Sequence, residues 1–341
     1  AGHGAVAAGA LRWGEPVLDS AITAIRSDGP WYRGLSACRA AREGACFESI
    51  AEHLWEEHDA QPWGGGSALA VPRGLRPVDA IAMALVRLAV KEPDRHLPTR
   101  EPTLRIARRL IPQLVSAVAH AQGGRERARR AAGAKSVAEA LAIAFGVTPR
   151  RRVVRAIDAT LVVSADHELN PSSFTARVSA SAGADLYACL SAAIATLSGP
   201  RHGGVPERIA TVLDQIGRPE RAAAVVRERL GQGEAMPGFN HPLYPSGDPR
   251  FEVLLEQARA IGGRRRSLAV VEALVGAMDL AGGAAPNYDL GTTAIAAALG
   301  LGPHAATALF AIGRSAGWVA HVIEQRQAGF LLRPRARYVG V

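Results

Sequence analysis

The sequence predicts an all-α protein, and three observations support this class. The 341 residues are 48% hydrophobic but only 5% aromatic, so Ala, Leu, Val and Ile supply most of the apolar content. Such an interior suits close-packed helices better than a β-sandwich, which favours β-branched and aromatic residues. Alternating strand patterns are almost absent, and no apolar run reaches the ~18 residues that a membrane span needs.

Helical spacing of apolar residues accounts for the first half of the chain, between Gly- and Pro-rich breaks. Residues 80–90 are mostly apolar and predict a buried helix. Pro112 is expected to kink or break the helix predicted over 105–122, because proline removes a backbone donor. Further helices are predicted over residues 137–145, 153–163 and 184–197.

The second half of the chain continues this pattern. Pro206 stands at the first position of the helix predicted over 206–216, where its fixed φ favours a helix start. With short connections, the whole chain would contain roughly fifteen helices or more. The remaining predicted helices cover residues 249–261, 267–280, 292–299 and 305–327.

Charge is unevenly divided between the two basic residue types. Forty basic and 31 acidic residues give a net charge of +9, and Lys91 and Lys135 are the only lysines. Arginine runs at 125–130, 150–152 and 264–266 could bind nucleic acid, but they lack interleaved aromatic residues. We therefore favour solvated helix ends over a nucleic-acid groove. Binding of a cofactor phosphate is a third interpretation of these runs.

Cysteine usage indicates a reducing compartment. Cys38, Cys46 and Cys189 form neither a CxxC motif nor a metal-ligand spacing, so we expect a cytoplasmic protein without disulfides or a metal site. No signal peptide opens the chain. Residue 1 is not Met, and the start looks processed, so a segment upstream is expected to be missing.

Three short stretches contain residues that are more typical of a catalytic or binding site than of a protein core. Residues 199–204 hold His202 beside a helix start, where the positive helix end should keep the imidazole neutral. Residues 237–250 bring His241 and Arg250 to another such junction, and 286–289 end in the carboxylate of Asp289. Each has a simpler interpretation, because a Gly-flanked His is often structural and an Asp before a helix is usually an N-cap.

Taken together, these stretches resemble the citrate synthase family, and the resemblance covers nearly the whole chain from about residue 17. The family patterns His-Glu-x-Asn-x-Ser, Gly-Pro-x-His-Gly-Gly, Gly-x-x-His, Asp-Pro-Arg and Pro-Asn-x-Asp have counterparts in order along the sequence. The matching residues are 165–173, Arg177, 199–204, 237–241, 248–250, 286–289, 310–314, 317–321, 324–325, 333–334 and 338–340.

The resemblance implies a fold and an assembly. We expect a large helical domain of residues 1–202 and 298–341, and a small domain of residues 203–297 that closes over it to exclude water. We also expect a homodimer with composite sites, in which Arg333 reaches the site of the other subunit.

The resemblance also implies roles for the site residues. Asp289 would remove a proton next to an acyl-thioester carbonyl while His202 hydrogen-bonds the developing oxyanion, and His241 would donate to the keto oxygen of a 2-oxo acid. Four residues would hold the carboxylates of that acid, namely His167, Arg250, Arg314 and Arg333. Four others would contact coenzyme A, namely Met236, Pro237, Gly238 and Asn287.

Several departures from the family pattern concern coenzyme A. Pro242 and Pro245 stand where basic residues are common, Asn240 replaces a usual Gly, and Val205 and Pro206 replace a common Ala-Asn. The arginines at 264–266 could compensate for the lost phosphate contacts. The acyl carrier and the acyl group are therefore less well defined than the 2-oxo acid.

The expected reaction joins an acyl-CoA, most simply acetyl-CoA, to oxaloacetate and yields citrate and free CoA, as in the tricarboxylic acid cycle. The CoA thioester is a co-substrate, and no tightly bound cofactor is expected. Two alternatives remain open: a paralogue for another acyl thioester or 2-oxo acid, such as a 2-methylcitrate synthase, and a ligand-sensing regulator whose DNA-binding segment is missing.

Overall fold

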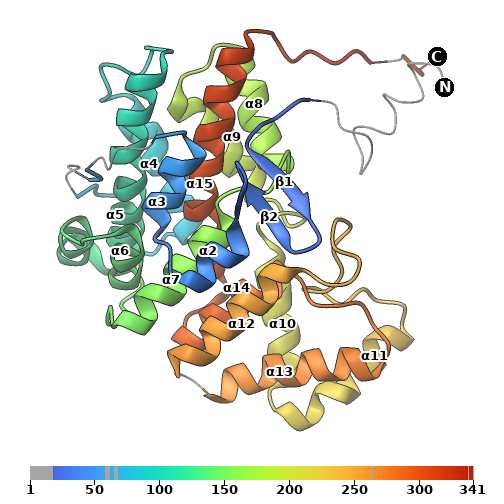
Figure 1. The fold of residues 1–341 in the computed structure, drawn as a ribbon. Coiled ribbons are helices and arrows are strands. Elements are labelled where there is room, and N and C mark those ends of the chain that lie inside the picture. Colours follow the sequence, from blue (N-terminus) through green and yellow to red (C-terminus); the bar gives the residue numbers. More distant parts are fainter. Residues whose placement is uncertain (1–17, 58–61, 65–67, 263–264, 337, 341) are drawn as a thin grey trace.

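The computed structural model describes residues 18–57, 62–64, 68–262, 265–336 and 338–340, and it confirms the all-α class (Figure 1). One small antiparallel sheet precedes the described helices, in the order β1-β2-β3. The sequence did not predict it, because such short strands show no clear alternation. Its strands are β1 (Thr23–Arg26), β2 (Gly29–Tyr32) and β3 (Leu35–Ser36).

Every predicted helix is present. The first half of the chain forms α2 (Ala37–Glu43), α3 (Phe47–Leu54), α4 (Pro77–Ala89), α5 (Arg100–Ala132), α6 (Val137–Ala144), α7 (Arg151–Ser164), α8 (Pro171–Ser181) and α9 (Leu186–Leu197). The second half forms α10 (Val205–Ile216), the 3-10 helix η1 (Pro219–Arg221), α11 (Ala222–Gly231), α12 (Pro249–Ile261), α13 (Arg265–Leu280), α14 (Tyr288–Leu299) and α15 (Pro303–Ala328).

The prediction that Pro112 breaks its helix is wrong. α5 continues through Pro112, and its backbone leaves the helical region at Gly124 instead, with φ 78° and ψ −170°. Pro112 cannot donate to the carbonyl of Arg108, one turn earlier, but the N–H of Gly64 donates to that carbonyl at 3.2 Å. A loop from elsewhere in the chain thus satisfies the acceptor that proline leaves unpaired.

The centre of the fold is α15, which packs against α5, α7, α8 and α9 (Figure 1). It is long and apolar enough to cross a membrane, but its apolar stretch is wholly buried within the fold. Gly313 and Gly317 let it approach α7, since a Cβ on Gly317 would lie 2.4 Å from the carbonyl oxygen of Ala165. The N–H of Gly317 donates to that same oxygen at 2.9 Å.

Two groups of helices are visible in Figure 1. α10, α11 and α13 lie at the bottom of the view, and α12 and α14 connect them to the helices around α15. The division into a large domain (1–202 and 298–341) and a small domain (203–297) stays a prediction, and the segment that carries His202 lies at its boundary.

Candidate active site

Six of the predicted site residues come from distant parts of the chain, and contacts through Tyr244, Tyr288 and Phe310 join five of them. The sixth, Asp289, directly follows Tyr288 and lies within electrostatic reach of Arg250 and Arg314. Most of the six lie at or next to helix starts, where the chain changes direction. They are His167 between α7 and α8, His202 before α10, His241 between α11 and α12, Arg250 in the first turn of α12, Asp289 in the first turn of α14, and Arg314 within α15.

The imidazole rings of His167 and His241 make an edge-to-face contact. Their ring centroids are 5.3 Å apart, and the Nε2 of His167 lies 3.1 Å from the hydroxyl of Tyr244. Burial, with the nearby guanidinium groups of Arg250 and Arg314, holds the pKa of His167 well below its ordinary value. Burial also lowers the pKa of His241 to about 4. Both imidazoles are therefore neutral at pH 7 and able to donate one hydrogen bond each.

Arg250 is buried beside Asp248. Its Nε donates to Oδ1 at 2.9 Å and its Nη2 to Oδ2 at 2.7 Å. Burial alone would lower the pKa of Arg250, but the Asp248 carboxylate outweighs this effect and raises it. Asp248 also accepts from the backbone N–H of Tyr288 at 3.1 Å, which ties the start of α12 to the start of α14.

Arg314 provides the second buried guanidinium. Its Nε donates to the carbonyl oxygen of Ser164 at 2.7 Å, and its guanidinium lies 4.9 Å from the ring of Phe310. The guanidinium of Arg250 lies 4.7 Å from the ring of Tyr288, which in turn contacts Phe310. A shared aromatic wall thus separates two cations suited to hold a dicarboxylate.

His202 lies on the other side of Phe310. Its Nε2 is 2.9 Å from the Oγ of Ser172, which also accepts from the indole N–H of Trp318 at 3.2 Å. Burial, and then Arg314, lowers the pKa of His202 to about 4. The ring is neutral as expected, but burial and a neighbouring cation account for this, rather than the helix end.

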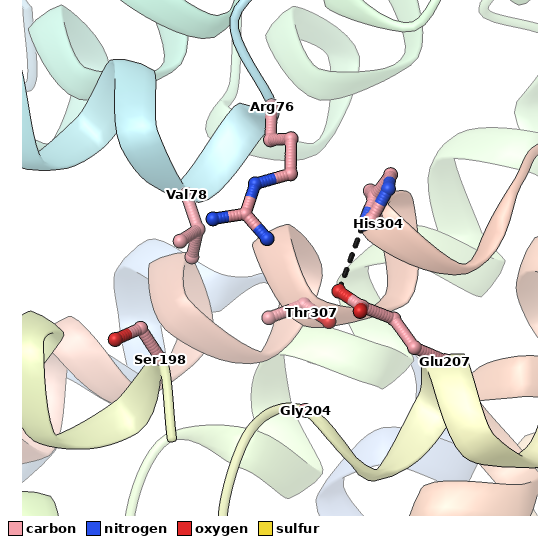
Figure 2. A pocket seen from close by; sticks show the side chains of 7 residues that line it. All are labelled: Arg76, Val78, Ser198, Gly204, Glu207, His304 and Thr307. Carbon is pink, nitrogen blue, oxygen red and sulfur yellow. Dashed lines mark hydrogen bonds and ion pairs between the residues drawn. The ribbon is translucent and has the colours of Figure 1, made fainter. Parts of the chain in front are cut away.

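The loop that carries His202 is restrained by neighbouring segments, and Figure 2 shows the pocket beside its Gly204. Thr307 Oγ1 donates to the carbonyl oxygen of Gly203 at 3.0 Å, and a Cβ at Gly203 would lie 2.6 Å from the carbonyl oxygen of Leu197. Beside this loop, His304 of α15 and Glu207 of α10 approach to 2.9 Å across a narrow pocket. Side chains from both groups of helices therefore fix the glycine-rich turn.

Asp289 is not the cap of its helix. The N-cap of α14 is Asn287, whose Oδ1 accepts from the N–H of Asp289 at 3.0 Å. The capping interpretation of Asp289 is therefore wrong, and its carboxylate is not needed to start the helix. Burial raises the pKa of Asp289 to about 7, despite the opposing effect of Arg250. Such a value suits a general base at neutral pH.

The residues predicted to contact coenzyme A pair with the Asp289 segment. Met236, Pro237 and Gly238 are buried, and the carbonyl oxygen of Gly238 accepts from the N–H of Asn287 at 2.9 Å. Asn240 has a φ of 67°, a conformation that glycine and asparagine tolerate best. The replacement of the family's glycine by Asn240 therefore preserves this backbone shape.

Arg333 is not brought to the other site residues within one chain. It is exposed on the extended segment after α15, which runs away from the body of the fold (Figure 1). Pro242 and Pro245 are also exposed, and Arg264 lies outside the described residues. Within the described part of the chain, no group of three His, Cys, Asp or Glu is placed to hold a metal.

Sequence reasoning missed several side chains that complete the site. Tyr244 contacts both histidines, Asp248 holds Arg250, and Ser172 contacts His202. Asp166, which precedes His167, lies 3.2 Å from His321, and both side chains are fully buried. All of these lie inside or beside the quoted motifs, so proximity in sequence was the available signal, but their partners depend on tertiary structure.

Comparison with known proteins agrees with the fold. The family model "Citrate synthase, C-terminal domain" matches residues 66–335. A citrate synthase of Deinococcus radiodurans is 33% identical over 279 residues, 79% of this chain and 74% of the relative. A 2-methylcitrate synthase of Mycobacterium tuberculosis is 30% identical over 275 residues, 79% and 70% of the two chains. The crystal structure of citrate synthase from Thermotoga maritima superposes with a TM-score of 0.77 at 26% identity, covering 96% of this chain and 94% of that chain.

The fold is that of an acyltransferase that works by condensation. The candidate site contains neutral histidines, buried arginines and the Asp289 carboxylate, which does not cap its helix. The chain belongs to the citrate synthase family.

Proposed function

We propose that this protein condenses acetyl-CoA with oxaloacetate, giving citrate and free CoA. The observation that carries the proposal is the state of Asp289: its pKa is raised to about 7, and Asn287 rather than Asp289 caps the helix. A carboxylate that does not cap its helix and lies within electrostatic reach of the buried Arg250 and Arg314 suits proton removal from carbon.

In the proposed first step, Asp289 takes a proton from the methyl carbon of the thioester. The electron pair of that C–H bond moves toward the carbonyl, and a hydrogen bond from His202 stabilises the enolate oxygen. A neutral imidazole donates without first having to lose a proton, and the buried site strengthens this interaction.

In the proposed second step, the enolate carbon bonds to the keto carbon of oxaloacetate. The keto oxygen gains negative charge and receives a hydrogen bond and then a proton from His241, while solvent returns a proton to His241 and takes up the one that Asp289 removed. Arg250 and Arg314 hold the two carboxylates, with His167 beside them. Water then hydrolyses the thioester of the condensed product and releases CoA.

The co-substrate is proposed to lie along the paired segments that contain residues 236–238 and 286–287. The backbone pairing of these two segments just before Asp289 supports this position for the acyl carrier. No tightly bound cofactor is proposed. The three cysteines are free thiols, in keeping with a reaction in the cytoplasm.

A homodimer is proposed as the working form, and an apolar face suits the contact. Met83, Val86 and Val90 are exposed along α4 and its end, with 37%, 59% and 78% of their surfaces accessible. The neighbouring helix α9 contains no charged residue. Copies with a charge of +9 repel each other, and this face carries few charges: Arg87 is exposed within it but donates to the carbonyl oxygen of Ala70, and Lys91 lies at its end. A second copy can therefore approach here at a small electrostatic cost. The exposed Arg333 could then reach the partner's site.

The test is thiol release from purified protein with oxaloacetate and a series of acyl-CoAs. We expect turnover with acetyl-CoA and a loss on the order of 10² to 10⁴ in Asp289→Asn. Absence of turnover in the wild-type dimer, or full activity in the Asn variant, would contradict the proposal. Faster turnover with propionyl-CoA would instead support a 2-methylcitrate synthase, the name of one of the relatives.

A further inference from the structure

Tyr244 occupies a central position among the proposed oxo-acid ligands, and no role has yet been assigned to it. It lies in the loop between α11 and α12 and is 3% exposed. Its ring centroid is 5.6 Å from that of His167 and 5.0 Å from that of His241, and the guanidinium of Arg250 lies 5.5 Å from the ring. One side chain thus contacts three residues of the proposed clamp.

The hydroxyl of Tyr244 determines the state of the His167 ring. It lies 3.1 Å from Nε2, and both groups are neutral at pH 7, since burial raises the pKa of the phenol and lowers that of the imidazole. A neutral imidazole has one donor and one acceptor nitrogen, and a phenol hydroxyl can take either part, so this hydrogen bond fixes the ring plane and couples the tautomer of His167 to the direction of the Tyr244 hydroxyl. Without it, His167 could rotate or change tautomer.

The same hydrogen bond joins two parts of the chain that are 77 residues apart. His167 belongs to the predicted large domain, and Tyr244 to the predicted small domain. Since both lie among the oxo-acid ligands, the bond can form fully only when the loop that carries His241 lies against the segment that carries His167. Binding of the acid and placement of this loop are then coupled.

We propose that Tyr244 is a positioning residue that sets the affinity for the 2-oxo acid, its hydroxyl orienting His167 and its ring seating Arg250. The proposal rests on the proposed function for the identity of the acid, but the orientation of His167 can be tested without any ligand. Tyr244 acts through its neighbours and exchanges no proton with substrate.

The main test compares Tyr244→Phe with wild type in the full chain. Phe keeps the ring contacts and removes only the hydroxyl, a hydrogen bond whose loss corresponds to a roughly 2- to 10-fold weaker affinity. We expect that weakening in calorimetric binding of oxaloacetate alone and in its KM, with the KM for acetyl-CoA unchanged within about twofold. Equal changes for both substrates, or none, would overturn the proposal.

The matched control is Tyr187→Phe. Tyr187 is also buried, and its hydroxyl donates to Glu92 at 3.2 Å, away from the site. The Tyr187→Phe variant also loses only a hydroxyl group, and its affinity for oxaloacetate should equal that of wild type. Tyr244→Leu removes the ring face as well and should weaken oxaloacetate binding further than Phe does. If Tyr244→Leu and Tyr244→Phe bind oxaloacetate with equal affinity, the proposed role of the Tyr244 ring in positioning Arg250 is disproved.

A ligand-free readout separates this proposal from the proposed function. Side-chain ¹⁵N resonances of histidine report which ring nitrogen carries the proton, and His167→Gln assigns the His167 signals. We expect these signals to shift or broaden in Tyr244→Phe and to stay in place in Tyr187→Phe. If wild type fails to bind oxaloacetate but His167 responds, only the proposed function fails. If His167 does not respond, the positioning role is disproved.

Discussion

The carboxyl group of Asp289 has consequences for both rate and stability. Because burial raises its pKa to about 7, the proposed base is protonated in part of the population at neutral pH. A base acts only when deprotonated, so kcat/KM should fall about tenfold per pH unit below that pKa and level off above it. A pH profile of kcat/KM for the acyl-CoA checks this expectation, and a profile that is flat from pH 5 to 8 would contradict it.

The free energy of unfolding should depend on pH in the opposite direction to kcat/KM. The folded-state pKa of Asp289 lies above the unfolded value of about 3.9, so the folded protein binds more protons between these values. Its contribution to stability is therefore full below pH 4 and is lost as the pH rises through 7. Urea unfolding at pH 8 should show Asp289→Asn to be at least as stable as wild type, although it is far less active.

The buried ion pair of Arg250 and Asp248 gives a second residue-scale prediction. Arg250→Leu leaves the Asp248 carboxylate buried without its partner, which should cost about 3 to 5 kcal/mol of unfolding free energy. The double variant Arg250→Leu/Asp248→Asn removes the unpaired charge but keeps an oxygen that can accept from the backbone at the starts of α12 and α14, so it should recover most of that loss. Chemical unfolding of both single variants and the double variant measures the coupling, and simple additivity would show that the pair is not coupled.

Sequence motifs were a better guide to the candidate site residues than to the side chains that position those residues. Asp289, His202 and Arg250 were predicted as site residues because each lies in a short pattern of chemically unusual residues, and their roles stay predictions. Asp248 and Tyr244 were passed over, because their roles depend on partners that tertiary folding supplies. The neutral state of His202 was anticipated, but its cause was not, since burial cannot be seen in a local pattern.

At the scale of elements, the close approach of α15 to α7 depends on glycine. A Cβ on Gly317 would lie 2.4 Å from the carbonyl oxygen of Ala165 and equally close to Oδ1 of Asp166. Gly317→Ala should therefore overpack this junction and cost about 1 to 3 kcal/mol in thermal or urea unfolding. It should also weaken oxaloacetate binding, because His167 follows directly.

The control for this prediction is Gly276→Ala in α13. Gly276 is exposed, and its added Cβ would meet nothing within 4 Å. Alanine favours helices over glycine by about 1 kcal/mol, so this variant should be unchanged or slightly more stable. Equal losses in both variants would show that contact with Ala165 is not the cause.

Helices were predictable as elements because their apolar spacing is local, whereas two features were not. The four-residue strands β1 and β2 are too short for a pattern, and their pairing depends on each other. The effect of Pro112 depended on Gly64, whose N–H meets the carbonyl that proline leaves unpaired. Local rules describe a residue's preference, and contacts from distant segments decide whether that preference prevails.

At the scale of the whole molecule, the apolar face of α4 should hold the proposed dimer together. A charge introduced by Val86→Glu would be buried without a partner in the interface, so it should shift the protein toward monomer at micromolar concentration. Analytical ultracentrifugation measures the shift. Leu280→Glu is the control, since Leu280 is 88% exposed on α13, far from α4. Equal sedimentation of Val86→Glu and wild type would place the interface elsewhere.

The contacts behind His167 also bear on how the protein acquires activity while it folds. Thr23 donates to Asp166 across 143 residues, Arg314 to Ser164 across 150, and His321 meets Asp166 across 155. Each contact closes a long loop, whose entropic cost is met only after the intervening helices have formed. The oxo-acid site is therefore among the last parts to assemble. A nascent chain that lacks α15 has most of the described helices but lacks Arg314, so catalysis can begin only after α15 has been synthesised.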